Sequence, residues 1–570
     1  MAEAKIQFTP AQAAAIQARG GSLLVSAAAG SGKTRVLVER VAGLIADPDH
    51  PVDADSLLIM TFTNAAAAKL RADITKRLAA EIRQHPQDVR LRRQQMRLQR
   101  ASIGTVDAFC LHFVQQNFSA LDVPPDFTIA DDATLVRLQQ ETLSTVLEQA
   151  YTDPNFCAFA DLYDRGRTDD TTGRAVQELY HFTQALQHPA QALQRFVEMW
   201  QSDAPPEKTQ WGKGVLRLLR TAQKIAAKDP AADKALTAVL MDDEDRMLLV
   251  LDRLDHGAWD TVPEALDNAD NWRRAGRVPG GIASNIAAMS ANMLRDRAKK
   301  QIATLRTDFL LCPAADYQAD RRRAAPLVAA LVRAVEQYRR TLLEAKLAEK
   351  VLDYADLEHM TLELLLTPEY ERTSLCRTVS ARYSAVLVDE YQDTNALQDA
   401  IYFALAAPDA SNLFFVGDIK QSIYRFRQAD PSVFVGKQTA WQPYPADAPV
   451  PYPEPATIAL DANFRSAPDV IRGINYFFET FFSRRLGGID YGDGQRLVVG
   501  RKDETYPGLC ELDVIREADT AADARTIAAR IAQMMADGYP VRDAEPAPAS
   551  MTISVFCCAA VRTLRCMKLP

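Results

Sequence analysis

Two groups of residues in this chain have the types and spacing for polyphosphate chemistry. The first follows an apolar run in SLLVSAAAGSGKTRVLVERV, residues 22–41. Backbone N–H groups can surround a polyphosphate only where side chains stay out of the way, so glycines suit the turn. We predict that Lys33 contacts the β- and γ-phosphates of a nucleotide and that Thr34 ligates Mg²⁺. The predicted nucleotide-binding loop comprises Ala27, Ala28, Ala29, Gly30, Ser31, Gly32, Lys33 and Thr34.

The loop departs from the usual pattern at its first position, where Ala27 stands in place of a glycine. The apolar run before the loop predicts a strand, and the periodic run after it predicts a helix. With GSGKT intact between them, the pattern favours nucleotide binding. The alternative is a glycine-rich turn between strand and helix that binds nothing.

The second group is a pair of adjacent carboxylates in YSAVLVDEYQDTNALQ, residues 383–398. The apolar run before Asp389 and Glu390 predicts a buried strand of a parallel sheet, whose carboxyl end faces a ligand. We predict that Asp389 holds Mg²⁺ through water and that Glu390 orients and deprotonates the attacking water. This division of roles predicts hydrolysis. The alternative is an acidic turn after a core strand.

The composition is typical of a large cytoplasmic protein, with 570 residues, 48% hydrophobic residues and 25% charged residues. This length predicts about three or four domains. No apolar run reaches the roughly 18 residues of a membrane span, and the start of the chain lacks a signal-peptide pattern. The eight cysteines include no CxxC pair, which argues against a disulfide framework and against a cysteine-based metal site.

The net charge of −8 argues against indiscriminate binding to nucleic acid. Residues 71–100 nevertheless carry nine Lys or Arg against three Asp or Glu. This basic run fits a local surface for nucleic acid, and it fits a solvated helical face equally well. Both interpretations stay open from the sequence.

Six motifs occur in the order found in superfamily 1A helicases, the UvrD/Rep type. They are AAAGSGKT (27–34), TFTNAAAAKLRADI (61–74), IGTVDAFC (103–110), LVDEYQDT (387–394), VGDIKQSIYRFRQADP (416–431) and DANFRS (461–466). The opening FTPAQAAAI, the DAFC segment and a long helical stretch resemble most closely the AddA/RexA branch of helicase-nuclease subunits. The similarity covers residues from about 5 to about 540.

The resemblance implies an ATP-dependent 3′–5′ DNA helicase that acts in double-strand break repair and homologous recombination, with ATP and Mg²⁺ as cofactors. It implies single-stranded and duplex-end DNA as substrates, and a partner subunit of the AddB/RexB type. Gln12 resembles the residue whose amide pairs with adenine. Gln421 resembles the γ-phosphate sensor, and Arg465 resembles an arginine finger supplied by the second motor domain.

The resemblance also implies contacts to single-stranded DNA. Tyr424 and Phe426, two residues apart and followed by Arg427, could present rings for base stacking beside a cation. The implied DNA-binding residues are Phe62, Thr63, Thr105, Tyr424, Phe426 and Arg427. An aromatic pair beside a strand is alternatively part of a core. Lys69 and Asp107 depart from relatives, many of which carry Glu and His at these two positions.

The motif positions predict an α/β fold: a RecA-like P-loop NTPase core with a parallel sheet, a large all-α insertion and the start of a second RecA-like domain. Lys33 and Asp389 belong to one predicted sheet, so the chain between them must leave the core and return. The predicted boundaries are 1–114 and 351–441 for the first motor domain, 115–350 for the helical insertion, 442–457 for a proline-rich hinge, 458–543 for part of the second motor domain and 544–570 for an aberrant tail.

We expect the chain to correspond to the N-terminal half of a helicase-nuclease subunit, because no acidic cluster followed by QxxxY occurs after residue 500. We also expect residues 544–570 to be out of frame. One allowed set of codons for residues 551–562, read in another frame, encodes a sequence that resembles a strand of the second motor domain in these helicases. The alternative function is a truncated ATP- and DNA-binding fragment without unwinding or nuclease activity. A P-loop ATPase unrelated to DNA would leave IYRFR and TFTN unexplained.

Overall fold

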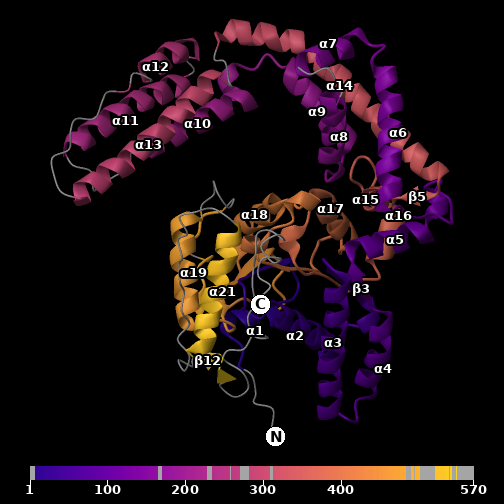
Figure 1. Cartoon of the computed structure of the whole chain (residues 1–570). Helices are drawn as coiled ribbons and strands as arrows, with labels where there is room; N and C mark the ends of the chain where they lie inside the picture. Colours follow the sequence, from indigo (N-terminus) through magenta and orange to yellow (C-terminus); the bar gives the residue numbers. More distant parts are fainter. Residues whose placement is uncertain are drawn as a thin grey trace. The chain divides into compact units, whose positions relative to one another are not determined.

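The computed structural model divides the chain into two compact units, Met1–Ile129 with Leu352–Pro570 and Ala130–Val351. The structure describes residues 7–164, 170–226, 234–256, 259–269, 272, 282–307, 312–445, 447–482, 489–492, 494–500, 520–537, 540–541 and 547–548. Figure 1 shows both units, with labels on the helices and on some of the strands.

A seven-stranded sheet forms the centre of the first unit, in the order β3-β2-β6-β7-β1-β9-β8. The strands are β1 (Leu23–Ala27), β2 (Leu57–Thr61), β3 (Ser102–Thr105), β6 (Ala385–Val388), β7 (Leu413–Gly417), β8 (Gln442–Pro443) and β9 (Ala456–Leu460). Every neighbouring pair is parallel. The predicted parallel sheet of the α/β fold is therefore confirmed.

The central strands are short apolar runs that are buried along their whole length, as in β1, β2, β6 and β7. Such runs are typical of a parallel sheet with helices on both faces. On one face, Phe414 joins a core with residues of α1 to α4. On the other face, Phe415 stacks with Tyr391 and contacts Phe403.

The α-helices that alternate with these strands belong to the same unit. They are α1 (Pro10–Gln17), α2 (Lys33–Ala46), α3 (Asn64–Gln84), α4 (Val89–Arg97), α5 (Val106–Gln116), α15 (Tyr354–Leu365), α16 (Ser374–Ser380), α17 (Ala396–Leu405) and α18 (Pro431–Ala440). Their starts are set by local chemistry. Thr63 and Thr105 cap α3 and α5 with their hydroxyls, and Asn395 caps α17 in a capping box.

The chain leaves the seven-stranded sheet after Leu460, which corrects the predicted boundary. The sequence placed a hinge at 442–457 and the second motor domain from 458 onward. Strand β9 instead pairs with β1 from Leu23↔Ala456 to Ala27↔Leu460. The reason is that ATIAL is a strand-forming run and β1 offers it an edge for pairing. The prolines before this run do not prevent the pairing.

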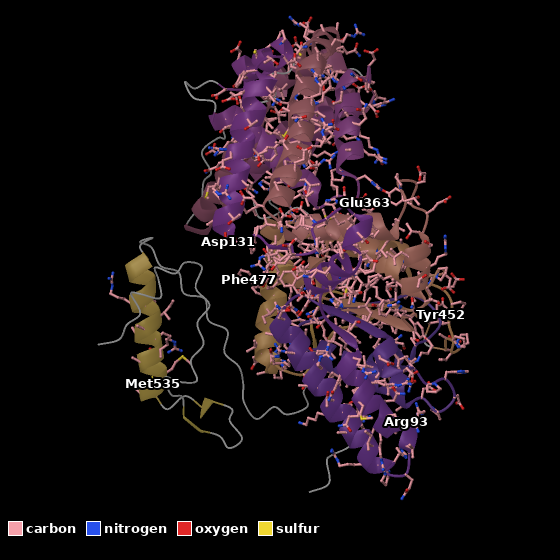
Figure 2. The ribbon with its side chains drawn as sticks, turned by 90° about the vertical axis from the view of Figure 1, so that its right-hand side faces the viewer. Arg93, Asp131, Glu363, Tyr452, Phe477 and Met535 are labelled. Atoms are coloured by element: carbon pink, nitrogen blue, oxygen red, sulfur yellow. The ribbon has the colours of Figure 1, made fainter. Side chains whose placement is uncertain are left out.

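The residues after β9 form smaller elements of the same unit. They are β10 (Ala462–Asn463), α19 (Pro468–Phe481), β11 (Val498–Val499), α21 (Thr520–Ala536), β12 (Pro540–Val541) and β13 (Ala547–Pro548). Strands β10 and β11 are parallel to each other in a separate two-stranded sheet. Figure 2 shows Phe477 on α19, where half of its surface is exposed. Apart from β13, the predicted out-of-frame tail lies outside the described residues.

The second unit consists mainly of α-helices in its described residues, in agreement with the predicted all-α insertion. Its α-helices are α6 (Asp132–Ala150), α7 (Pro154–Tyr163), α8 (Asp170–Gln184), α9 (Pro189–Gln201), α10 (Gln210–Ala226), α11 (Lys234–Asp255), α12 (Val262–Ala269), α13 (Ile282–Thr307) and α14 (Ala314–Ala348). One core joins α14 to α6, α7, α8 and α9, and another joins α10 to α13. Strands β4 (Thr128–Ile129) and β5 (Val351–Leu352) lie at the two positions in the sequence where one unit ends and the other begins. None of the described helices has the length and apolar character to cross a lipid bilayer.

Candidate nucleotide and DNA site

The sequence motifs converge on one edge of the seven-stranded sheet, because each follows the carboxyl end of a parallel strand. The motifs after β6, β1 and β9, and the Gln421 part of the motif after β7, are those predicted for nucleotide chemistry. The motifs after β2 and β3, the two strands at one side of the sheet, are those predicted for DNA. The motif after β7 contributes to both groups, because Gln421 belongs to the first and Tyr424, Phe426 and Arg427 belong to the second.

The phosphate loop runs from the end of β1 to the start of α2. Gly30 and Gly32 have φ values of 71° and 85°, which favour glycine. The first α2 backbone bond joins the Val36 N–H to the Gly32 carbonyl, so the N–H groups of the first turn have no partner within the helix. The buried Ser31 Oγ also has no hydrogen-bond partner. These donors fit an anion at the helix N-terminus.

Lys33 and Glu390 meet across the sheet edge, although 357 residues separate them. The Lys33 Nζ lies 2.9 Å from the Glu390 Oε2, and the Gln392 Nε2 donates to the same oxygen at 3.0 Å. Glu390 has a φ of 52°, an uncommon conformation for a residue with a side chain. The structure thus joins the predicted phosphate-binding cation to the predicted base.

Two further carboxyl groups surround Glu390. Burial, with the nearby charge of Glu390, raises the pKa of Asp389 to about 6 and the pKa of Asp393 to about 6. The charge of Lys33 opposes both shifts. One oxygen of Asp393, Oδ1, is buried without a hydrogen-bond partner. This concentration of carboxylates favours a cation at the end of β6.

Gln12 lies under the phosphate loop rather than on the surface. It is 7% exposed, and its Nε2 donates to the Ser31 carbonyl at 2.9 Å. Its Oε1 accepts the Thr9 N–H, which completes the capping box of α1. Its pairing with adenine stays a prediction.

Gln421 follows β7 and is tied to a buried carboxylate. Its Nε2 donates to Asp418 Oδ2 at 2.7 Å. The other oxygen of Asp418 accepts Lys420 Nζ at 2.8 Å, and Lys420 also donates to the Gln495 Oε1 at 3.0 Å. Asp418 therefore contacts both Gln421, the predicted γ-phosphate sensor, and Lys420, which also contacts the segment before β11.

Arg465 follows β10 and comes directly after Phe464, whose backbone contacts the phosphate loop. The Phe464 N–H donates to the Gly30 carbonyl at 3.0 Å, and the Arg465 N–H donates to Asn463 Oδ1 at 2.8 Å. Its side chain is exposed. The predicted finger and the loop are thus brought together by the fold, whereas the sequence separates them by more than 400 residues.

Three aromatic rings form a continuous patch at the predicted DNA side. The ring centroids of Phe62 and Tyr424 are 4.4 Å apart, and those of Tyr424 and Phe426 are 5.7 Å apart. The Arg427 guanidinium lies 5.6 Å from the centroid of Tyr424 and 5.9 Å from that of Phe426. Because Phe426 is 77% exposed, the alternative that it is a core residue is wrong.

The predicted threonines at this side already serve as helix caps. Thr63 Oγ1 accepts the Ala66 N–H, and Thr105 Oγ1 accepts the Ala108 N–H. Asp107 follows in α5, where burial raises its pKa and the charge of Arg427 opposes that shift. Arg427 and Asp107 therefore interact electrostatically at one end of the aromatic patch.

The basic run at 71–100 is divided between contacts within the protein and solvent. Arg71 donates to the carbonyls of Leu98, Ala101 and Ile103. Arg77 pairs with Glu39 and Glu81, and Arg90 donates to the Ile45 carbonyl. Others in the run, such as Arg93 in Figure 2, are exposed. Both interpretations of the exposed residues of this run therefore stay open.

Comparison with known proteins now decides the family. The model of the UvrD/REP helicase N-terminal domain matches residues 8–442, which is most of the chain. This chain belongs to the UvrD/REP helicase family.

Curated relatives point to one branch of the UvrD/REP family. The chain is 33% identical over 573 residues to the A-type subunit of the ATP-dependent helicase/nuclease of Anoxybacillus flavithermus, covering 94% of this chain and 47% of that protein. Proteins of the same description match in Moorella thermoacetica, at 35% identity over 88% of this chain and 36% of the relative, and in Desulforamulus reducens, at 34% over 87% and 40%. The chain spans less than half the length of these relatives.

Some contacts of this UvrD/REP site involve residues to which the sequence gave no role. Gln392 links Glu390 to Asp393 and accepts the Asp418 N–H at 2.8 Å. Asn463 donates to the Ala29 carbonyl at 2.8 Å. Both residues lie inside the motifs LVDEYQDT and DANFRS, so motif membership was the available signal. Their individual contacts depend on long-range pairing that a single sequence does not display.

Proposed function

We propose that this chain is the ATP-hydrolysing motor of a 3′–5′ DNA helicase. The observation that carries the proposal is the 2.9 Å contact between Lys33 and Glu390 at the carboxyl edge of the sheet. A phosphate-loop lysine beside a carboxylate is the arrangement that ATP hydrolysis needs, since one group holds the phosphates and the other acts on water.

Each residue of the proposed site has a distinct task. The loop amides and Lys33 bind the polyphosphate, and Glu390 accepts the proton of the attacking water. Gln421 and Arg465 act on the γ-phosphate, and Gln12 pairs with adenine. Their support is that Gln421 follows β7, the Arg465 backbone is bonded to Asn463 beside the loop, and Gln12 lies under that loop. Charge that develops on the transferring phosphoryl group would then face preplaced cations.

Thr34 and Asp389 are the residues proposed to hold Mg²⁺. Asp389 is supported by its place at the end of β6, where burial, together with the nearby charge of Glu390, raises its pKa to about 6, because a bound cation would stabilise the ionised carboxylate. Among the described residues no cluster of three or more His, Cys, Asp or Glu forms a metal site. Mg²⁺ commonly uses one or two protein ligands together with phosphates and water, so this donor set fits. When bound, the ion neutralises charge on the phosphates.

Single-stranded DNA is the proposed track of the motor. The aromatic patch of Phe62, Tyr424 and Phe426 offers rings for base stacking, and Arg427 supplies a cation next to two of them. The hydroxyls of Thr63 and Thr105 each accept an N–H and keep their own proton for a phosphate.

The relatives' description, a helicase/nuclease subunit, extends the proposal. We propose a role in double-strand break repair and recombination, on duplex ends, with a partner subunit of the AddB/RexB type. Bacterial DNA lies in the cytoplasm, which is therefore the proposed location. The alternative is a module that binds ATP and DNA without unwinding or nuclease activity. The alternative is kept because the matched relatives are more than twice as long as the matched region.

The test is ATP turnover by the purified chain with and without a single-stranded oligonucleotide. The proposal expects hydrolysis that DNA stimulates and that Lys33→Ala removes. Turnover equal to that of Lys33→Ala under both conditions would overturn it. A forked-duplex unwinding assay on the same sample separates the helicase from the alternative, since a binding module hydrolyses or binds ATP but separates no strands.

A further inference from the structure

Asn463 occupies the point at which the chain changes sheets. Strand β9 ends at Leu460 in the seven-stranded sheet, and β10 (Ala462–Asn463) pairs with β11 (Val498–Val499) in the two-stranded sheet. The Asn463 side chain is buried, with 3% of the residue exposed. A polar side chain at such a junction must find hydrogen bonds to offset its burial.

The amide of Asn463 bonds to both sides of the junction. Its Nδ2 donates to the Ala29 carbonyl of the phosphate loop at 2.8 Å. Its Oδ1 accepts the N–H groups of Arg465 and Ser466, each at 2.8 Å. One planar group therefore holds the loop with one end and the turn that carries Arg465 with the other.

Close packing reinforces this connection. A Cβ on Gly30 would lie 2.8 to 2.9 Å from the amide atoms of Asn463. The neighbouring backbone bonds, from Phe464 to Gly30 and from Ala28 to Leu460, flank the same contact. Because the loop and the turn touch without a gap, a shift of the loop at Ala29 must shift the turn as well.

We propose that Asn463 is a positioning residue that couples the phosphate loop to Arg465. The inference rests on the proposed function, in which Arg465 acts on the γ-phosphate. A polyphosphate held by the loop sets the position of the Ala29 carbonyl, and the Asn463 amide transfers that position to the turn. An arginine contributes to phosphoryl transfer only when it is placed within a fraction of an ångström, so the coupling governs turnover more than binding.

Asn463→Ser tests the coupling, because serine can still accept an N–H of the turn but is too short to reach the Ala29 carbonyl. The expected result is a kcat for ATP lower by about tenfold or more, with nucleotide affinity, measured with a fluorescent ATP analogue, within about threefold of wild type. Combined with Arg465→Ala, the serine variant should slow hydrolysis no further than Arg465→Ala alone, since coupled residues are not additive.

Asn475→Ser is the matched control. Asn475 is a buried asparagine of the same unit that also makes three bonds, to the Leu497 backbone and to Tyr491, and none to the loop. Its serine variant should lower the melting temperature as Asn463→Ser does but leave kcat unchanged. If Asn463→Ser does not fold, Asn463→Asp, which keeps the shape and the acceptor, takes its place.

The outcomes separate two failures. If Asn463→Ser hydrolyses ATP as wild type does, or if its effect multiplies with that of Arg465→Ala, the coupling is overturned while the proposed function stands. If Arg465→Ala leaves hydrolysis unchanged, or if the wild-type chain does not hydrolyse ATP, the proposed role of Arg465 fails and the coupling fails with it.

Discussion

The ammonium of Lys33 lies 2.9 Å from a carboxylate oxygen of Glu390. The lysine begins α2 after β1, and the glutamate follows β6. Strand β7 lies between β1 and β6 in the sheet. The pair is partly shielded, with side-chain exposures of 13% and 37%. It places the proposed phosphate-binding cation beside the proposed proton acceptor.

Lys33→Ala should lower ATP hydrolysis by at least about a hundredfold, because a preplaced charge on the transferring phosphoryl group stabilises its transition state by several kcal/mol. Steady-state release of phosphate measures this. Lys69→Ala is a suitable control, since Lys69 is exposed on α3 outside the phosphate loop. Turnover by Lys33→Ala equal to the control would remove Lys33 from the site.

Glu390→Gln should separate binding from hydrolysis. The variant keeps the shape of the side chain and an acceptor for Lys33 and Gln392, but it cannot take a proton from water. We expect a fluorescent ATP analogue to bind at least as tightly as to wild type while hydrolysis fails. Loss of nucleotide binding in this variant would instead assign Glu390 to the metal.

Phe426→Ala should weaken binding of a single-stranded oligonucleotide by about 1–3 kcal/mol through lost stacking. Basal ATP hydrolysis without DNA and the melting temperature should stay near wild type, because the ring is 77% exposed. Fluorescence anisotropy gives the affinity. Tyr476→Ala, which removes an equally exposed ring on α19, is the control and should leave DNA affinity unchanged. Equal affinities for both variants would take Phe426 out of the DNA surface.

Glu358 on α15 predicts a pH dependence of stability. Burial, with the nearby charges of Asp107 and Asp353, raises its pKa from 4.5 to about 8, against hydrogen bonds from Gln398 and Asn395. Because the folded pKa is above the unfolded value, the stabilisation is complete below about pH 4.5 and is lost as the pH rises through about 8.

The side chain of the Glu358→Gln variant is neutral at every pH. The melting temperature of this variant, minus that of wild type, should therefore increase as the pH rises from about 4.5 to about 8. Calorimetric melting temperatures across this range measure the difference. Glu363→Gln, on the exposed side of the same helix in Figure 2, should follow the wild-type profile. Parallel profiles for Glu358→Gln and wild type would show that Glu358 is ionised in the fold.

The sequence by itself determined the local features of this protein. GSGKT between an apolar run and a helical run predicts a phosphate loop because glycine conformations and helix N-termini are local properties. The strand before Asp389 and the helical character of the insertion were predictable for the same reason. Periodicity and turn chemistry act over a few residues, and a single chain displays them directly.

Tertiary structure decided which of these local features meet. Residues 357 positions apart, Lys33 and Glu390, share a hydrogen bond only because β1 and β6 lie in one sheet. Strand β9 belongs to that sheet rather than to the second domain, since pairing with β1 depends on an available edge and not on the prolines before it. Asn463 and Gln12 owe their contacts with the loop to the same packing. Strand order and side-chain burial are set by the free energy of the whole core, which no short segment contains.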